Sequence, residues 1–121
     1  MLQRLAEQFE YSELLDKASE TDDSALRMAY IVAFAFSPYS ATTNRTKKPF
    51  NPILGETFEY LDEERNFKFL SEQVSHHPPI SAGYCESKNY KYWANTNVKS
   101  QFWGKSFEFK PLGVAHCTID K

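Results

Sequence analysis

Two adjacent histidines and two prolines interrupt a strand-like pattern in Ser71-Glu72-Gln73-Val74-Ser75-His76-His77-Pro78-Pro79-Ile80-Ser81-Ala82. A residue that precedes proline is biased toward extended backbone, so the chain path is restricted at His77 and Pro78. Successive side chains of an extended segment point to opposite sides, and the two imidazoles can therefore share a ligand only if a bulge or turn re-aims one of them. A turn at the prolines would do this.

On both sides of this break, the residue pattern predicts β-strands. The first two strands are joined by the turn-like run Asp62-Glu63-Glu64-Arg65-Asn66, which predicts a hairpin. Further turn-like residues separate the later strands, and a six-stranded antiparallel meander is the simplest topology for such short connections. The expected strands are 57–61, 67–74, 80–86, 90–99, 102–109 and 114–119.

Two helices are expected before the strands. The first covers about residues 1–18, with an irregularity near Tyr11, because its apolar residues follow a helical period. Residues 21–23 offer a capping side chain and first-turn carboxylates for the second helix. Since Met28–Phe36 is apolar nearly all round, we expect this helix to be buried on several sides, and Pro38 to end or kink it.

Length, charge and cysteine content exclude several classes of protein. A chain of 121 residues forms one small domain or part of one, and a net charge of -2 gives no sequence-blind attraction to nucleic acid. Cys85 and Cys117 have neither disulfide-framework nor zinc-site spacing. There is no signal-peptide pattern, and the longest apolar run is too short to span a bilayer. We therefore expect a cytosolic protein with only peripheral membrane contact.

A second constrained stretch lies upstream, at Lys47-Lys48-Pro49-Phe50-Asn51-Pro52-Ile53-Leu54-Gly55-Glu56. Lys48 and Asn51 each precede a proline, which limits the backbone at both. A lysine ammonium, an asparagine amide and two imidazoles form a donor-rich set that matches a phosphate. These residues predict recognition of a phosphorylated headgroup.

Three other interpretations of the same residues stay open. The histidine pair could belong to a metal site, although no third ligand is nearby and His116 is remote in sequence. Ser75 or Ser81 beside a histidine, with Glu72 near, could form a catalytic triad, although the nucleophile-elbow motif does not occur. The prolines and histidines could also only shape a loop.

Three motifs resemble hallmarks of the oxysterol-binding protein family. Residues 72–79, Glu72-Gln73-Val74-Ser75-His76-His77-Pro78-Pro79, resemble the family's fingerprint. Residues 48–56 resemble a second hallmark, at the expected distance upstream, and Phe102-Trp103-Gly104-Lys105-Ser106 is similar to a third. The resemblance extends essentially from Met1 to Lys121.

The resemblance implies an α+β, mainly β fold. Two N-terminal helices would be followed by an antiparallel β-meander that forms part of an incomplete lipid-binding β-barrel, whose tunnel holds one lipid under a lid. Residues 1–121 would then be a partial lipid-binding domain, with 1–46 as the helical segment and 47–121 as the first barrel strands. The lid and the C-terminal portion of the domain would lie outside this chain.

The resemblance also implies the ligands and their sites. Members of the family exchange phosphatidylinositol 4-phosphate for a sterol, or in some branches for phosphatidylserine, between membranes. By the family pattern, Tyr39 would contact bound sterol at the tunnel base. The residues that would bind the phosphoinositide headgroup are Lys48, Asn51, His76 and His77.

These implications describe a lipid-transfer protein and not an enzyme. We expect no cofactor, no bound metal and no nucleic-acid partner. The expected partners are the lipid ligands and the surfaces of organelle membranes or their contact sites. The alternative is a phosphoinositide-dependent lipid sensor or scaffold that does not transport lipid.

Overall fold

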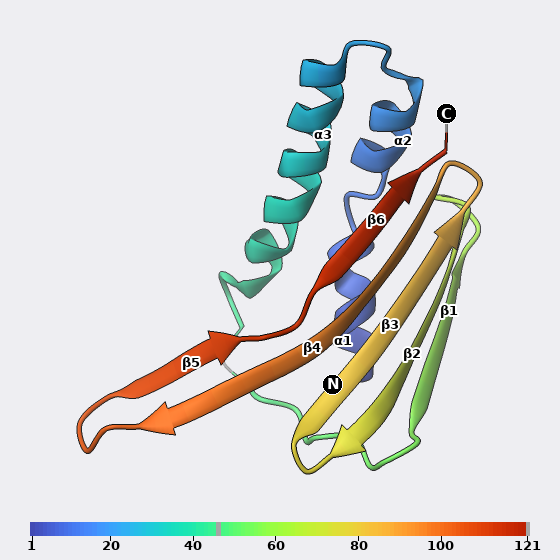
Figure 1. Cartoon of the computed structure of the whole chain (residues 1–121). Helices are drawn as coiled ribbons and strands as arrows, with labels where there is room; N and C mark the ends of the chain where they lie inside the picture. The colour runs from blue at the N-terminus through green and yellow to red at the C-terminus, as the bar shows by residue number, and fades with distance from the viewer. Residues whose placement is uncertain (46, 121) are drawn as a thin grey trace.

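The structure, a computed structural model, describes residues 1–45 and 47–120. Helices lie on one side of an open antiparallel sheet (Figure 1). The elements are α1 (Leu2–Ala6), the 3-10 helix η1 (Glu7–Phe9), α2 (Glu13–Glu20), α3 (Ser24–Phe36), the 3-10 helix η2 (Ser37–Thr42), β1 (Thr57–Asp62), β2 (Phe67–His76), β3 (Pro79–Ser87), β4 (Tyr90–Phe102), β5 (Phe107–Pro111) and β6 (Ala115–Ile119). The expected end of the helical segment at Thr46 lies outside the described residues, as does Lys121.

The predicted hairpin at residues 57–74 is confirmed as β1 and β2. Its turn is held by Asp62, whose carboxylate accepts hydrogen bonds from the Arg65 backbone N–H at 2.8 Å and from the Arg65 guanidinium at 3.0 Å. The backbone hydrogen bond is the main cause that lowers the pKa of the Asp62 carboxyl below its usual value. Asn66 completes the turn with a positive φ of 54°, a conformation that asparagine tolerates.

The predicted meander holds for the first five strands but is wrong at the last step. The sheet order is β1-β2-β3-β4-β5, and β6 pairs with β4 instead of β5. Because β4 has 13 residues and β5 pairs only with its second half, the edge of the first half remains free to bind β6. The strand expected at 102–109 is also wrong at its start, since residues 103–106 form the connection to β5.

The return of the chain toward β4 depends on close backbone contact. The Asn97 carbonyl accepts hydrogen bonds from Leu112 N at 2.7 Å and from Gly113 N at 3.2 Å. A Cβ atom at Gly113 would lie 2.0 Å from the Asn95 carbonyl oxygen. Only glycine fits at this position without a shift of the backbone, and it thereby lets β6 reach β4.

The helices begin as the sequence predicts. The expected irregularity near Tyr11 appears as a turn between η1 and α2. Asp23 caps α3 by accepting a hydrogen bond from Leu26 N at 2.8 Å, and α3 ends at Phe36, shortly before Pro38. The expected helical pattern is therefore confirmed, with η2 as a short continuation.

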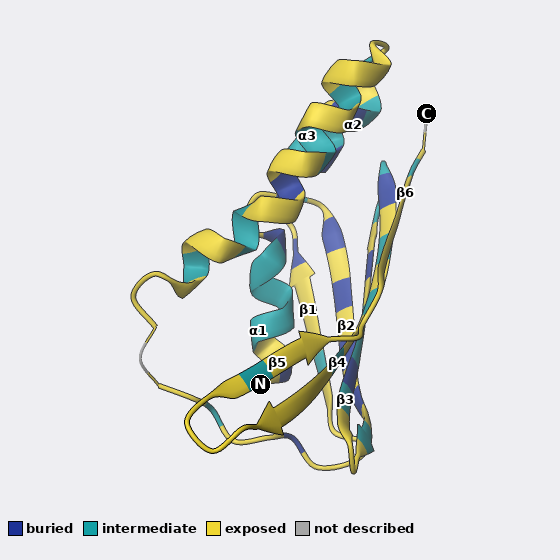
Figure 2. Cartoon of the chain, turned by 60° about the vertical axis from the view of Figure 1, so that its left-hand side comes forward, coloured by how far each residue is buried: buried dark blue, intermediate teal, exposed yellow. Residues whose placement is uncertain are grey.

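The expected burial of the second helix on several sides is wrong for the described chain. Phe34 is the buried residue of α3, whereas Met28 and Phe36 remain 58% and 67% exposed. The helix packs against α2 and, through Phe34, against Phe9. Figure 2 accordingly shows most of α3 in the colour of exposed residues. The apolar pattern indicates a capacity for burial, but the described residues cover only one side.

The core lies between the helices and one face of the sheet. Phe9 from η1 is its centre, and it contacts rings from α3, β2 and β4. The ring centroids of Phe34, Phe67, Phe69 and Tyr92 lie 5.8, 5.5, 5.7 and 5.3 Å from that of Phe9. Along β2 every second residue from Phe67 to Gln73 is buried, and the residues between them are exposed on the opposite face. The core thus fixes which side chains of β2 point toward the helices, up to the register shift that precedes the histidine turn.

Candidate functional site

The histidine pair lies at the turn between β2 and β3. His76 ends β2, Pro79 begins β3, and the peptide bond between His77 and Pro78 is cis. The strand register shifts between Gln73 and Ser75, just before the turn. The two imidazole rings consequently lie edge to face with centroids 4.6 Å apart. The bulge and turn bring together two side chains that a regular strand would separate.

Gln73 connects the histidine turn with the segment before β1. Its side chain is buried, and its Oε1 accepts a hydrogen bond from the Ser81 hydroxyl on β3. Its backbone N–H donates to the Glu56 carbonyl at 2.9 Å, and its own carbonyl accepts from Gly55 N at 2.9 Å. One residue therefore joins β2, β3 and the loop of residues 47–56. Gln73 is not among the residues predicted for the site, although its alternation with Phe69 and Ser71 indicates that its side chain lies on the buried face of β2.

The loop of residues 47–56 is anchored at both ends. At its start, the Arg4 guanidinium donates to the Lys47 carbonyl at 2.6 Å. Near its end, the Glu56 carboxylate accepts from Ile53 N at 3.0 Å, and Gly55 adopts a positive φ of 79°. Pro52 is buried in the middle of the loop. These contacts fix the start of the loop beside α1, and the hydrogen bonds to Gln73 fix its end beside β2 (Figure 1).

The four expected headgroup residues are all exposed, and the contact that the structure shows among them, within the described residues, is the one between the rings of His76 and His77. Lys48 and Asn51 lie on the anchored loop, and His76 and His77 lie at the turn. We call this set of four residues the loop–turn site. It offers one ammonium, one amide and two imidazoles to solvent, a combination suited to hydrogen bonding with an anionic oxygen.

Tyr39 lies apart from these elements in sequence, within η2. Its side chain is 70% exposed, and its ring centroid lies 6.2 Å from that of Phe36. The described residues therefore leave most of this ring uncovered. Its expected contact with sterol stays a prediction.

The structure also bears on the metal and catalytic interpretations. Among the described residues, no three His, Cys, Asp or Glu side chains form a group that could hold a metal ion. His116 stacks on Trp93 with centroids 5.3 Å apart. The Ser81 hydroxyl is directed to Gln73 rather than to an imidazole. These contacts give His116 and Ser81 partners other than the two histidines of the turn.

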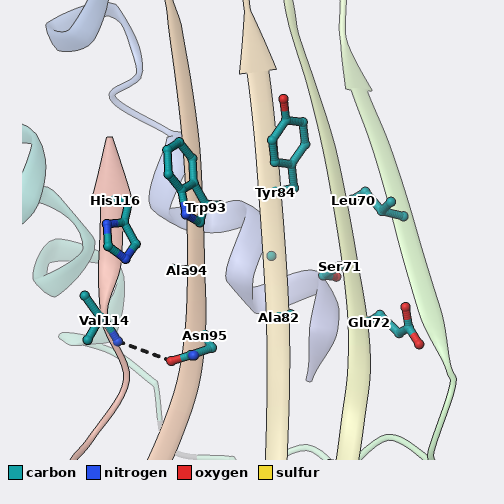
Figure 3. A pocket seen from close by; sticks show the side chains of 11 residues that line it. Leu70, Ser71, Glu72, Ala82, Tyr84, Trp93, Ala94, Asn95, Val114 and His116 are labelled. Carbon is teal, nitrogen blue, oxygen red and sulfur yellow. Dashed lines mark hydrogen bonds between the residues drawn. The ribbon is translucent and has the colours of Figure 1, made fainter. Parts of the chain in front are cut away.

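A shallow groove lies on the sheet face opposite to the helices. Figure 3 shows Leu70, Tyr84, Trp93 and His116 on this face, with α1 behind the sheet. The groove has a volume of about 420 Å³. On the β6 side of the groove, the Asn95 side-chain oxygen accepts a hydrogen bond from Val114 N at 3.2 Å. Its lining is mostly apolar, unlike the loop–turn site.

The two cysteines lie on strands that flank β4. Burial raises the pKa of the Cys85 thiol to about 12, and partial desolvation also raises the pKa of Cys117. Both residues are paired in register with Tyr92 of β4. Cys85 therefore behaves as an inert core residue rather than as a reactive nucleophile.

Comparisons with known proteins agree with the motifs. The family model described as oxysterol-binding protein matches residues 1–121. Oxysterol-binding protein-related protein 6 of Mus musculus is 57% identical over 121 residues, covering 99% of this chain and 13% of the relative. Oxysterol-binding protein homolog 2 of Saccharomyces cerevisiae is 53% identical over 119 residues, covering 98% of this chain and 9% of the relative.

Solved structures of similar domains share the fold. The Osh1 ORD domain in complex with ergosterol superposes with a TM-score of 0.91 at 49% identity, covering 98% of this chain and 28% of that chain. The Osh3 ORD in complex with PI(4)P from Saccharomyces cerevisiae gives a TM-score of 0.86 at 37% identity, covering 98% of this chain and 32% of that chain.

The chain thus spans a small part of the curated relatives and about three tenths of the solved domains. The match to the Osh1 domain confirms the expected fold class, in which helices precede an antiparallel sheet that forms part of a lipid-binding barrel. With a family model that matches from Met1 to Lys121 and relatives more than half identical, this chain belongs to the oxysterol-binding protein family.

Proposed function

We propose that this chain forms part of a lipid-binding domain that exchanges phosphatidylinositol 4-phosphate for a sterol or phosphatidylserine between membranes. The observation that carries the proposal is the loop–turn site, in which Gln73 joins the anchored loop to the histidine turn. Support comes from the similar Osh3 domain, which is described in complex with PI(4)P, and from the Osh1 domain, described with ergosterol and with cholesterol.

The headgroup chemistry follows from the four side chains. Lys48 would supply positive charge to the 4-phosphate, while Asn51 and the imidazole N–H groups would donate hydrogen bonds to phosphate or inositol oxygens. A hydrogen bond to a charged group contributes about 1.5–3 kcal/mol. The loss of one such contact should therefore weaken binding about 10- to 150-fold.

Exchange needs no bond chemistry. A cavity that removes the lipid body from water gains about 25 cal/mol per Å² of buried apolar area. Two lipids that compete for one cavity displace each other, and a gradient of the phosphoinositide can then drive transport of the second lipid. Binding and release thus replace catalysis, and no cofactor is required.

The proposed location is the cytosol, with peripheral attachment to organelle membranes. No helix in residues 1–45 or 47–120 is both long enough and apolar enough to cross a bilayer.

Sedimentation with vesicles tests the headgroup assignment. Vesicles containing phosphatidylinositol 4-phosphate should bind the chain more tightly than vesicles containing phosphatidylinositol. Lys48→Ala and the double variant His76→Ala/His77→Ala should each lose this preference. Lys88→Ala is the matched control, because it removes the same charge at the opposite end of β3.

The same assay separates exchange from sensing. Removal of the lipid from the vesicles by a chain extended at both ends would support exchange, whereas binding without removal would favour a phosphoinositide sensor or scaffold. Equal binding to both kinds of vesicle by the extended chain would contradict the headgroup assignment.

A further inference from the structure

Gln73 and Ser81 form the last regular pair of β2 and β3 before the histidine turn. The Gln73 N–H donates to the Glu56 carbonyl and the Gln73 carbonyl accepts from Gly55 N, so both backbone groups of Gln73 are directed away from β3. In an antiparallel sheet, such a residue and its opposite partner form a non-hydrogen-bonded pair, whose side chains lie close together. The hydrogen bond from the Ser81 hydroxyl to Gln73 Oε1 is therefore the direct polar link between the two strands at this position.

The bulge of β2 follows this pair directly. Ser75, and not Val74, pairs with Ile80, so Val74 is the extra residue of β2. Because side chains alternate along a strand, one extra residue reverses the side to which the later side chains point. This reversal applies to His76, the last residue of β2, whose ring lies 4.6 Å from the ring of His77. The bulge therefore decides whether the two imidazoles lie together.

The hydrogen bond between Gln73 and Ser81 lies on the buried face of the sheet. The two residues are 1% and 7% exposed. On the other side of Ser81, Thr96 of β4 is its partner in register, and the Thr96 hydroxyl donates to the Ser81 carbonyl at 3.2 Å. Side chains thus join three neighbouring strands in one row beside the bulge. Because water has little access to the buried pair, the loss of one partner leaves the other without a hydrogen bond.

The strand pairing on the far side of the bulge is short. Two pairs precede the turn there, and the second of them joins His76 to Pro79. Pro79 has no N–H to donate to its partner. The firmer anchor of the bulge is therefore the hydrogen bond between Gln73 and Ser81 on its other side. Without this anchor, a slip of one residue removes the bulge and returns His76 to the opposite side of the strand.

We propose that Gln73 and Ser81 are positioning residues for phosphoinositide recognition. Their hydrogen bond keeps the bulge in place, and the bulge keeps His76 beside His77, so that both imidazoles bind one phosphate. Neither positioning residue touches the lipid headgroup, because both are buried. The inference rests on the proposed headgroup site and adds to it the residues that set the affinity of the histidine pair. The loss of one imidazole contact with the phosphate lowers affinity by about tenfold or more.

Binding of short-chain phosphatidylinositol 4-phosphate to the chain tests the positioning, with short-chain phosphatidylinositol as the reference ligand. Ser81→Ala removes the donor and Gln73→Met removes the acceptor, and each should weaken binding of the phosphoinositide about tenfold. Ser81→Thr retains a hydroxyl and should restore the wild-type affinity. Ser71→Ala is the matched control, because it removes a hydroxyl from the same buried face of β2, before the bulge, and it should leave the affinity unchanged.

Combined variants separate positioning from a general loss of structure. In the His76→Ala background, Ser81→Ala should cause no further loss of affinity, because the imidazole that it positions is absent. In the Asn51→Ala background, Ser81→Ala should still weaken binding about tenfold. Circular dichroism confirms folding of each variant, and Ser81→Ala, which removes one oxygen atom, provides the test if Gln73→Met does not fold.

The outcomes distinguish this inference from the headgroup assignment. Equal losses in the His76→Ala and Asn51→Ala backgrounds would overturn the positioning, and so would an unchanged affinity in the folded Ser81→Ala variant. In both cases, a wild-type preference for the phosphoinositide would leave the headgroup assignment standing. A wild-type chain that binds both short-chain lipids equally would overturn the headgroup assignment and the positioning together.

Discussion

The hydrogen bond between Gln73 and Ser81 offers a quantitative test of how the loop–turn site is held. Gln73→Met keeps the side-chain volume but removes the oxygen that accepts from the Ser81 hydroxyl, and both side chains are buried. A buried polar group left without a partner costs about 1–3 kcal/mol. With a urea m-value of about 1 kcal/mol/M for a small chain, the unfolding midpoint should fall by about 1–3 M.

A double-mutant cycle isolates this contact from other effects of substitution. Gln73→Met/Ser81→Ala removes both partners and should be less destabilised than the sum of the single variants, by at least about 0.5 kcal/mol. Gln101→Met, a change at an exposed position near the end of β4, should stay within about 0.5 kcal/mol of the wild type. Urea unfolding followed by tryptophan fluorescence gives all four values. Additive single effects, or a Gln73→Met variant as stable as the Gln101→Met control, would refute the assigned role of Gln73.

Three further predictions concern the frame around the site. Because the pKa of Asp62 is lowered in the folded chain, its contribution to stability is present above the unfolded pKa of about 4 and is lost as pH falls through the lower folded value. Asp62→Asn should therefore flatten the acid decline of the urea midpoint, and an unchanged decline would contradict this. Gly113→Ala should destabilise the β4–β6 pairing far more than Gly83→Ala, whose Cβ would meet the Phe69 ring at an ordinary 3.4 Å; equal urea midpoints would show that the backbone near Asn95 adapts. At pH 8, Ellman's reagent should modify Cys117 while Cys85 reacts only on unfolding, and Cys117→Ser should abolish the fast phase.

Local sequence patterns predict most of the helices and strands, whereas the pairing of strands that lie far apart in the sequence could not be predicted from them. The turn at Asp62 and the cap at Asp23 follow from side chains that bond to nearby backbone, so both could be predicted from a few residues. The pairing of β6 with β4 depends on the relative lengths of β4 and β5 and on the close approach at Gly113. No local pattern encodes those distances.

The candidate site shows the same division. The prolines predicted restricted backbone around His77, and the need for a bulge or turn between the histidines was foreseeable. The anchoring role of Gln73 was not, because it rests on the Glu56 carbonyl and on Ser81, which only the folded sheet brings together. The apolar pattern of Met28–Phe36 indicates that this helix can be buried on several sides, but it does not indicate whether other residues of the chain cover it.

The headgroup assignment is tested most directly by NMR of the three histidine side chains during titration with short-chain phosphatidylinositol 4-phosphate. His116 is an internal control, because it stacks on Trp93 on the sheet face opposite to the helices. We predict saturable shifts of the His76 and His77 imidazole signals, little change at His116, and a much weaker response to short-chain phosphatidylinositol. Binding of the phosphoinositide without shifts at His76 and His77, or with equal shifts at His116, would contradict the loop–turn site as its headgroup site.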